Sequence, residues 1–129
     1  MKQKLFEKVI FTSHSGKKLL FKIDCDALTN EDIECIAEFI ASKTEFGVVD
    51  GIPRGGIRLA NALEKYAVID APFNYLIVDD VFTTGTSMEA HKAKLSPLIN
   101  PNDVVGWVIF ARGKLPLWIN AMFQLYSDA

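Results

Sequence analysis

Two adjacent carboxylates, Asp79 and Asp80, stand between an apolar run (residues 75–78) and a turn rich in hydroxyl groups. The run is typical of a parallel strand covered on both faces, and parallel sheets bind ligands where their strands end. Ionised carboxylates accept hydrogen bonds from the paired hydroxyl groups of a sugar, whereas hydroxyl and N–H groups at a helix start bind phosphate. The turn consists of Thr83, Thr84, Gly85, Thr86 and Ser87. The stretch therefore predicts a sugar phosphate site.

Each half of this pattern also has a simpler explanation. The acids could cap a helix and form a salt link, and Thr, Ser and Gly are common residues at helix starts. A loop that binds a nucleoside triphosphate ends in Gly-Lys-Ser or Gly-Lys-Thr, and a dinucleotide fingerprint reads Gly-x-Gly-x-x-Gly. Neither motif is present here. The turn therefore suits one phosphate monoester better than a nucleoside triphosphate.

Residues 77–87 resemble the signature of the type I phosphoribosyltransferases over eleven consecutive positions. The resemblance implies that Asp79 and Asp80 hold the ribose 2′ and 3′ hydroxyl groups of phosphoribosyl pyrophosphate (PRPP), and that residues 83–87 hold its 5′-phosphate. It makes Asp79, Asp80 and Arg54 the candidate catalytic residues and implies a homodimer. Mg²⁺ is also implied, bound through PRPP and contacting Asp79 or Asp80 through water, because several phosphate charges would lie beside two carboxylates.

Residues 51–56 are similar to the pyrophosphate loop of the same family. By this resemblance Arg54, Gly55 and Gly56 bind the pyrophosphate. Glycine lets backbone N–H groups approach a diphosphate closely, and arginine makes bidentate, charge-assisted contacts. Such loops in the family can carry a cis peptide bond that does not precede proline. The alternative interpretation is a plain strand-to-helix turn with a surface arginine.

Residues 11–24 look like the hood of orotate phosphoribosyltransferases, which covers the base. The resemblance implies an orotate-like or other pyrimidine acceptor, with Lys17, Phe21 and Arg112 as its contacts. Arg112 follows the last predicted core strand, where orotate enzymes have an Asp-Arg pair, but Ala111 precedes it here. The alternatives are an ordinary hairpin, solvated turn lysines at positions 17 and 18, and a surface arginine.

The connection to the acid pair is short, because only 22 residues lie between Gly56 and Asp79. Family enzymes usually carry there a long mobile loop, which excludes water and stabilises charge on the leaving pyrophosphate. No room for such a loop remains, so PRPP binding is better supported than fast turnover. Two functions besides transfer stay open. One is a non-catalytic PRPP- or nucleotide-binding regulatory protein, and the other is a structural partner that binds a complete enzyme through its apolar tail (residues 115–123).

Strands that alternate with helices predict an α/β fold, a small doubly wound parallel sheet with an N-terminal hood hairpin. Apolar alternation over residues 5–24 predicts the hairpin, with its turn at residues 14–17. A hydroxyl at Thr29 and an acid at Asp32 predict a capped helix start. The apolar face of that helix consists of Ile33, Ile36, Ala37 and Ile40.

The remaining elements complete one domain over residues 1–129. It divides into a hood-like hairpin (1–27), an α/β core (28–112) and a tail (113–129) that packs on the core as a short helix or an extended segment. Strands are expected over residues 46–51, 67–70, 74–78 and 104–111, and helices over residues 57–66 and 86–95, the first lined by Ile57, Leu59, Ala60 and Leu63.

Composition is that of a soluble globular protein, with half of the residues hydrophobic and 23% charged. The net charge of -2 argues against a general nucleic-acid binder, and no apolar run approaches the ~20 residues that cross a bilayer. The N-terminus lacks a signal-peptide core, so we expect a cytoplasmic protein. Cys25 and Cys35 are expected to pack in the core. The chemistry needs no covalent nucleophile, so His14 and His91 have no required role, and His91 is expected at the surface.

Overall fold

The computed structural model describes residues 4–8, 11–12, 18–19, 21–71 and 74–125. Its centre is a four-stranded parallel sheet in the order β5-β6-β7-β8. The strands are β5 (Val48–Gly51), β6 (Tyr75–Phe82), β7 (Val104–Ala111) and β8 (Ile119–Gln124). Because all four strands are parallel, their carboxyl ends lie at one edge of the sheet.

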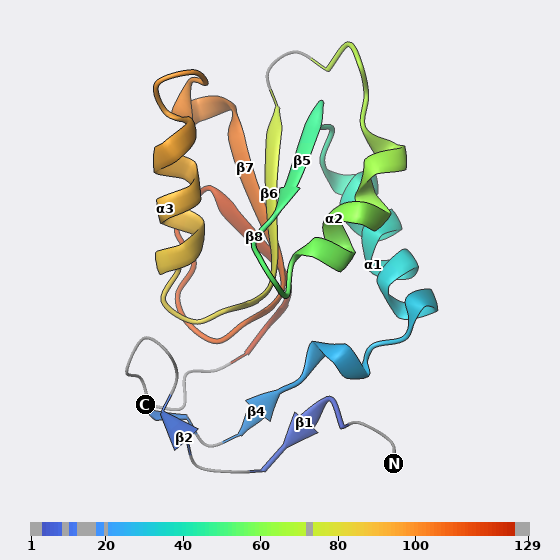
Figure 1. Cartoon of the computed structure of the whole chain (residues 1–129), viewed down its shortest axis with the longest axis vertical. Coiled ribbons are helices and arrows are strands. Elements are labelled where there is room, and N and C mark those ends of the chain that lie inside the picture. The colour runs from blue at the N-terminus through green and yellow to red at the C-terminus, as the bar shows by residue number, and fades with distance from the viewer. Residues whose placement is uncertain (1–3, 9–10, 13–17, 20, 72–73, 126–129) are drawn as a thin grey trace.

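Helices cover both faces of this sheet. α1 (Asn30–Lys43) and α2 (Ile57–Leu63) lie on one face, and α3 (Thr86–Leu95) lies on the other (Figure 1). Short 3-10 turns are formed by Cys25–Ala27, Glu64–Tyr66 and Pro101–Asp103. The arrangement confirms the predicted doubly wound α/β fold. Within the described ranges, no helix combines the length and the apolar character that crossing a membrane requires.

The first half of β6 is apolar at every position because both of its faces are covered. Leu76, Ile77 and Val78 are each 0% exposed. Leu76 and Val78 belong to the core beneath α1 and α2, whereas Ile77 belongs to the core that contains Met88 of α3. A polar side chain on this strand is therefore tolerated only near the sheet edge.

α1 begins at the capping box that the sequence predicts. The Thr29 hydroxyl accepts a hydrogen bond from Asp32 N (3.0 Å), and the Asp32 carboxylate accepts one from Thr29 N (2.8 Å). These bonds satisfy N–H groups that have no partner within the helix. The predicted apolar face of α1 is buried; it consists of Ile33, Ile36, Ala37 and Ile40.

The N-terminal segment forms a small antiparallel hood at the carboxyl edge of the parallel sheet (Figure 1). In it β1 (Phe6–Glu7) pairs with β4 (Lys22–Ile23), and β2 (Phe11–Thr12) pairs with β3 (Lys18–Leu19). The Phe6 ring docks the hood through edge-to-face contacts with Phe21 and with Phe110 of β7. The predicted hairpin is confirmed, and its predicted turn at residues 14–17 lies outside the described residues.

Of the two forms expected for the tail, a short helix or an extended segment, the structure has the extended one. Its residues 119–124 are β8, which pairs with β7 in parallel and places Ile119 opposite Gly106. Ile119 is buried with the α3 side of the core. The tail thereby supplies an edge strand of the sheet.

The strand predicted at residues 67–70 is wrong, because this segment forms a turn. Val68 N donates to Phe46 O (2.9 Å), and Ala71 N then donates back to Val68 O (2.9 Å). The segment thus makes one hydrogen bond to the residues before β5, where a strand would make a series of bonds to its neighbour. The short connection leaves too few residues for a turn and a strand together.

Two residues predicted to lie in the core are exposed. Ile57, the first residue of α2, is 41% exposed, whereas Leu59, Ala60 and Leu63 of the same helix are buried as predicted. Cys25 is buried as predicted, but Cys35 is exposed. Ile57 lies at the margin of the apolar face of α2, whereas Cys35 lies on the side of α1 opposite its apolar face, so helical periodicity itself exposes the cysteine.

We expect Thr29→Ala to lower the free energy of unfolding by about 1 kcal/mol, because Asp32 N–H loses its acceptor. Urea unfolding followed by circular dichroism measures the change. Ser42→Ala is the control, since the Ser42 hydroxyl donates to Phe39 O within α1 and alanine is the better helix former. A Thr29→Ala variant as stable as the wild type would contradict the cap.

Candidate functional site

Asp79 and Asp80 lie inside the second half of β6 and not beyond its end. The strand continues to Phe82, and its pairing with β7 places Asp79 opposite Val108. The prediction that the strand ends before the acids is therefore wrong, because backbone pairing with β7 runs past them. The carboxyl end of β6 still faces the hood (Figure 1), so the acids lie near the edge where a ligand can bind.

Each carboxylate is held by the backbone N–H that follows it. Asp79 Oδ1 accepts from Asp80 N at 2.8 Å, and Asp80 Oδ1 accepts from Val81 N at 2.7 Å. Burial, followed by a side-chain hydrogen bond with Asp80 and the charge of Asp80, raises the pKa of Asp79 to about 8, while the bond from Asp80 N acts in the opposite direction. A ligand that brings hydroxyl donors or a cation would favour the ionised form and lower this pKa.

The hydroxyl-rich turn opens α3, as the sequence predicts. Gly85 has a φ of 82°, in the left-handed region that favours glycine, and a Cβ atom there would lie 2.6 Å from the Phe82 ring. The first helical bond runs from Glu89 N to Gly85 O (2.8 Å). The exposed Thr84 and Thr86 carry hydroxyl oxygens 3.0 Å apart. The turn thus presents hydroxyl groups at the start of a ten-residue helix, whose dipole attracts anions.

The predicted pyrophosphate loop, residues 51–56, consists of the last residue of β5 and the connection to α2, and the Pro53–Arg54 peptide bond in it is cis. A Cβ atom at Gly55 would collide with the Asp80 carboxylate. The loop backbone therefore lies directly against one member of the acid pair, an approach that a residue with a side chain could not make. The structure brings the glycine loop and the acids together at one edge.

A cavity of about 260 Å³ adjoins this contact. Its lining includes Arg54, Gly55 and Asp80, together with Asp24 and Cys25 from the segment that follows β4. Burial, and then the charge of Asp80, raises the pKa of the Cys25 thiol to about 12. A thiol with that pKa stays protonated and is a poor nucleophile. The cavity is therefore suited to binding a polar ligand and not to covalent chemistry at the cysteine.

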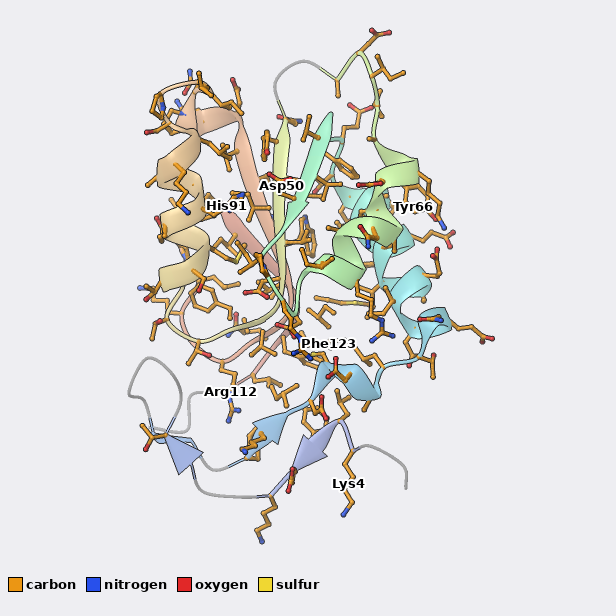
Figure 2. All side chains as sticks on the ribbon, in the orientation of Figure 1. Lys4, Asp50, Tyr66, His91, Arg112 and Phe123 are labelled. Carbon is orange, nitrogen blue, oxygen red and sulfur yellow. The ribbon has the colours of Figure 1, made fainter. Side chains whose placement is uncertain are left out.

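Arg112 and Phe21, two of the three predicted base contacts, contact each other. Arg112 is only 3% exposed, its Nη1 donates to Phe21 O (2.5 Å), and its guanidinium carbon lies 4.1 Å from the centroid of the Phe21 ring. Figure 2 shows Arg112 between the sheet and the hood. The alternative of a surface arginine is wrong, because the side chain joins two parts of the fold. The third predicted contact, Lys17, lies outside the described residues.

No protein-family profile and no curated protein matches this chain, but solved structures do. The chain is similar to orotate phosphoribosyltransferase from Aeropyrum pernix, with a TM-score of 0.71 and 19% identity over 94% of this chain and 88% of that chain. The chain has the type I phosphoribosyltransferase fold. At this level of identity the similarity establishes the fold alone.

Two further structures share the phosphoribosyltransferase fold. UMP synthase from Leishmania donovani matches with a TM-score of 0.72 and 18% identity, over 94% of this chain and 34% of that longer chain. Orotate phosphoribosyltransferase from Mycobacterium tuberculosis H37Rv, solved in complex with PRPP, matches with a TM-score of 0.64 and 17% identity, over 92% of this chain and 89% of that chain. The fold extends over nearly the whole chain, hood included.

The connection from α2 to β6 lies far from the acid pair in this phosphoribosyltransferase fold. It leaves the 3-10 turn at Glu64–Tyr66, and its described part, residues 67–71, forms a turn at the end of the sheet opposite the hood (Figure 1). The segment in which a long closing loop would be expected therefore does not cover the carboxyl edge.

Arg58 is a residue near the site that the sequence reading missed. It lies in the first turn of α2, and its guanidinium donates to Leu28 O (2.5 Å) and to Cys25 O (3.4 Å). Arg58 thereby connects α2, which follows the glycine loop, to the segment between β4 and α1. The sequence contained an indication of this role. A cation in the first turn of a helix interacts unfavourably with the helix dipole, so its presence there indicates a compensating contact elsewhere.

His91 was expected at the surface, and it is only partly exposed. Its side chain is 27% exposed, and its Nε2 lies 3.3 Å from Asp50 Oδ2 of β5. Figure 2 shows both residues between α3 and β5. His91 follows the buried Met88 by three positions and precedes Leu95 by four. That spacing puts all three on the face of α3 that meets the sheet.

We expect Asp79→Asn to stabilise the ligand-free protein increasingly as the pH rises from about 4 to about 8. The folded state holds the Asp79 proton up to a pKa of about 8, against an ordinary value of 3.8. Ionisation of Asp79 in this range therefore costs folding free energy, a cost that asparagine does not carry. Thermal unfolding at a series of pH values measures the difference between variant and wild type.

Asp70→Asn is the matched control, since it removes one carboxylate from the exposed connection after α2. It is expected to show no such trend. A difference between Asp79→Asn and wild type that stays constant with pH would contradict the raised pKa.

Proposed function

We propose that this protein binds PRPP with Mg²⁺ at the carboxyl edge of its sheet and transfers the ribose 5-phosphate to a nitrogenous base, releasing pyrophosphate. The observation that carries the proposal is the contact between the Gly55 backbone and the Asp80 carboxylate. This contact places a loop suited to binding a diphosphate next to acids suited to binding a ribose diol. The same strand leads directly into a turn suited to a 5′-phosphate. The three parts match the three parts of PRPP.

Each part has a role that follows from its chemistry. Asp79 and Asp80 would accept hydrogen bonds from the ribose 2′ and 3′ hydroxyl groups. Residues 83–87 would bind the 5′-phosphate at the start of α3. Arg54, Gly55 and Gly56 would bind the pyrophosphate through the guanidinium and backbone N–H groups. The likeness to a structure solved with PRPP supports this assignment at the level of the fold.

Carboxylate oxygens are the donors that Mg²⁺ prefers, so Asp79 and Asp80 fit the ion. Asp79 or Asp80 would hold it through coordinated water, while most of its ligands would come from PRPP. The ion would supply neutralisation of the charge that develops on the leaving pyrophosphate.

The proposed reaction is a displacement at ribose C1. A ring nitrogen of the base would form the new bond to C1 with its lone pair and release its proton to water, and the C1–oxygen bond would break with both electrons going to pyrophosphate. Arg54 would stabilise the charge on the leaving group. No covalent bond to the protein is needed, which agrees with a Cys25 thiol that stays protonated.

The acceptor we propose is a pyrimidine-like base that enters beside the hood. The similarity to orotate phosphoribosyltransferases supports this class of base. Arg112 and Phe21 would act mainly by fixing the hood, since they already bind each other. Lys17 is retained in the proposal as a base contact.

A second candidate function is a regulatory protein that binds PRPP without turning it over. One observation favours it, the position of residues 67–71 at the far end of the sheet from the acid pair (Figure 1). Without a segment closing over the carboxyl edge, binding would remain while the exclusion of water would be weaker.

Incubation with PRPP, Mg²⁺ and a panel of purine and pyrimidine bases should release pyrophosphate with at least one base. A coupled pyrophosphate assay measures the release, and calorimetry measures PRPP binding in the same buffer. Binding without release for any base would contradict transfer and support the regulatory function. Absence of both would contradict the proposed site as a whole.

Asp80→Asn should weaken PRPP binding by ~1–3 kcal/mol, the scale of a lost charge-assisted hydrogen bond. Calorimetric titration with Mg²⁺ present measures the affinity. Asp70→Asn, distant from the edge, serves again as the control for the loss of one negative charge. An unchanged affinity in Asp80→Asn would remove the ribose assignment.

A further inference from the structure

The carboxylate of Asp50 is contacted by side chains from two other elements. On one side the Tyr75 hydroxyl, from the start of β6, donates to Asp50 Oδ2. On the other side His91 Nε2, from α3, lies 3.3 Å from the same oxygen. One carboxylate of β5 is thereby connected to both β6 and α3, and Figure 2 shows Asp50 and His91 in the space between α3 and β5.

The three elements that meet at Asp50 each lead into one part of the proposed PRPP site. β5 runs from Asp50 into the glycine loop at residues 51–56. β6 runs from Tyr75 to the acid pair and on to the hydroxyl-rich turn. α3 begins at that turn and carries His91 on its second turn. The contact therefore spans the segments that would bind the pyrophosphate and the 5′-phosphate.

Apolar packing fixes α3 only weakly. Met88 is its one buried residue, and Leu95 is partly buried at its other end. His91 occupies the sheet-facing position between them.

Polar side-chain contacts therefore help to position the helix. Trp118 Nε1 donates to Glu89 Oε1 (2.5 Å), and Lys92 Nζ lies 4.7 Å from the centroid of the Trp118 ring, next to β8. His91 makes the contact of α3 with β5.

The hydrogen bond from Tyr75 to Asp50 has a defined direction. Burial, followed by the hydrogen bond to Asp50, raises the pKa of Tyr75 to about 12, so its hydroxyl remains a donor. His91 Nε2 lies within hydrogen-bonding distance of the same carboxylate oxygen. Two side chains from different elements thus meet at one oxygen of Asp50, which holds β6 and α3 at a set separation.

We propose that Asp50, with Tyr75 and His91, is a positioning cluster that sets the spacing between the glycine loop and the turn at residues 83–87. The spacing selects a ligand that carries a 5′-phosphate and a diphosphate on one sugar over ligands that carry only one of these groups. The inference rests on the proposed PRPP site and adds residues outside it. A ligand that bridges two loops gains affinity from their correct separation, whereas a ligand that contacts one loop does not.

His91→Ala tests the positioning cluster with three probes, which are PRPP, ribose 5-phosphate and inorganic pyrophosphate, each with Mg²⁺. The affinity for PRPP should fall about tenfold, the scale of a lost hydrogen bond to a charged group. The affinities for ribose 5-phosphate and for pyrophosphate should stay the same. Isothermal titration calorimetry measures all three.

Two variants of α3 make the comparison specific. Lys94→Ala truncates an exposed side chain on the last turn of the same helix and should leave all three affinities at wild-type values. His91→Gln supplies an N–H donor at a similar reach and should recover most of the PRPP affinity. Tyr75→Phe, which removes the hydroxyl donor to Asp50, should reproduce the loss seen for PRPP in His91→Ala.

Three results would overturn the inference. An unchanged PRPP affinity in both His91→Ala and Tyr75→Phe would show that the cluster does not set the spacing. An equal loss for all three probes would show a purely structural role. A wild-type protein that binds no PRPP would overturn the proposed function and the inference together, so the two failures are distinguishable.

Discussion

The contact between the Asp80 carboxylate and the Gly55 backbone is the constraint on which the rest of the site depends. It requires β5 and β6 to be neighbours in the sheet, and Ile52 N extends their pairing by donating to Val78 O (2.9 Å). It also requires a loop with no side chain at its closest point. An acid inside a parallel strand is costly unless an edge, a hydrogen bond or a ligand compensates. The acids are therefore placed near the end of the sheet, where each accepts a hydrogen bond from the backbone N–H that follows it and Asp80 lies against the loop.

Features that depend on neighbours in the chain could be predicted from the sequence. The capping box of Thr29 and Asp32 joins residues three positions apart, and the Gly85 turn passes directly into its helix. The continuous apolar run at the start of β6 reflects coverage on both faces, which identifies a parallel sheet before any pairing is known. In each case the residues that determine the local structure and the structure itself lie in the same short stretch of sequence.

Features that depend on distant partners could not be predicted in this way. β6 continues past Asp79 because β7 pairs with it there, and no property of the acid pair itself indicates this. His91 faces Asp50 across 41 positions. Residues 67–70 have strand-forming residue types, but the short connection decides their conformation. The residues of the candidate site lie in short continuous motifs, so the sequence predicts them. The residues that support the site are far apart in the chain, so the sequence does not predict their contacts.

Arg112 contacts the hydroxyl-rich turn region as well as the hood. Its backbone N–H donates to Phe82 O, at the entry to the hydroxyl-rich turn, and its side chain donates to Phe21 O in the hood. A single buried residue thus belongs to both neighbourhoods. Thermodynamic coupling between two binding events needs a shared element that both of them bias. In this fold Arg112 is an element that the hood and the start of the turn share, because it contacts both of them.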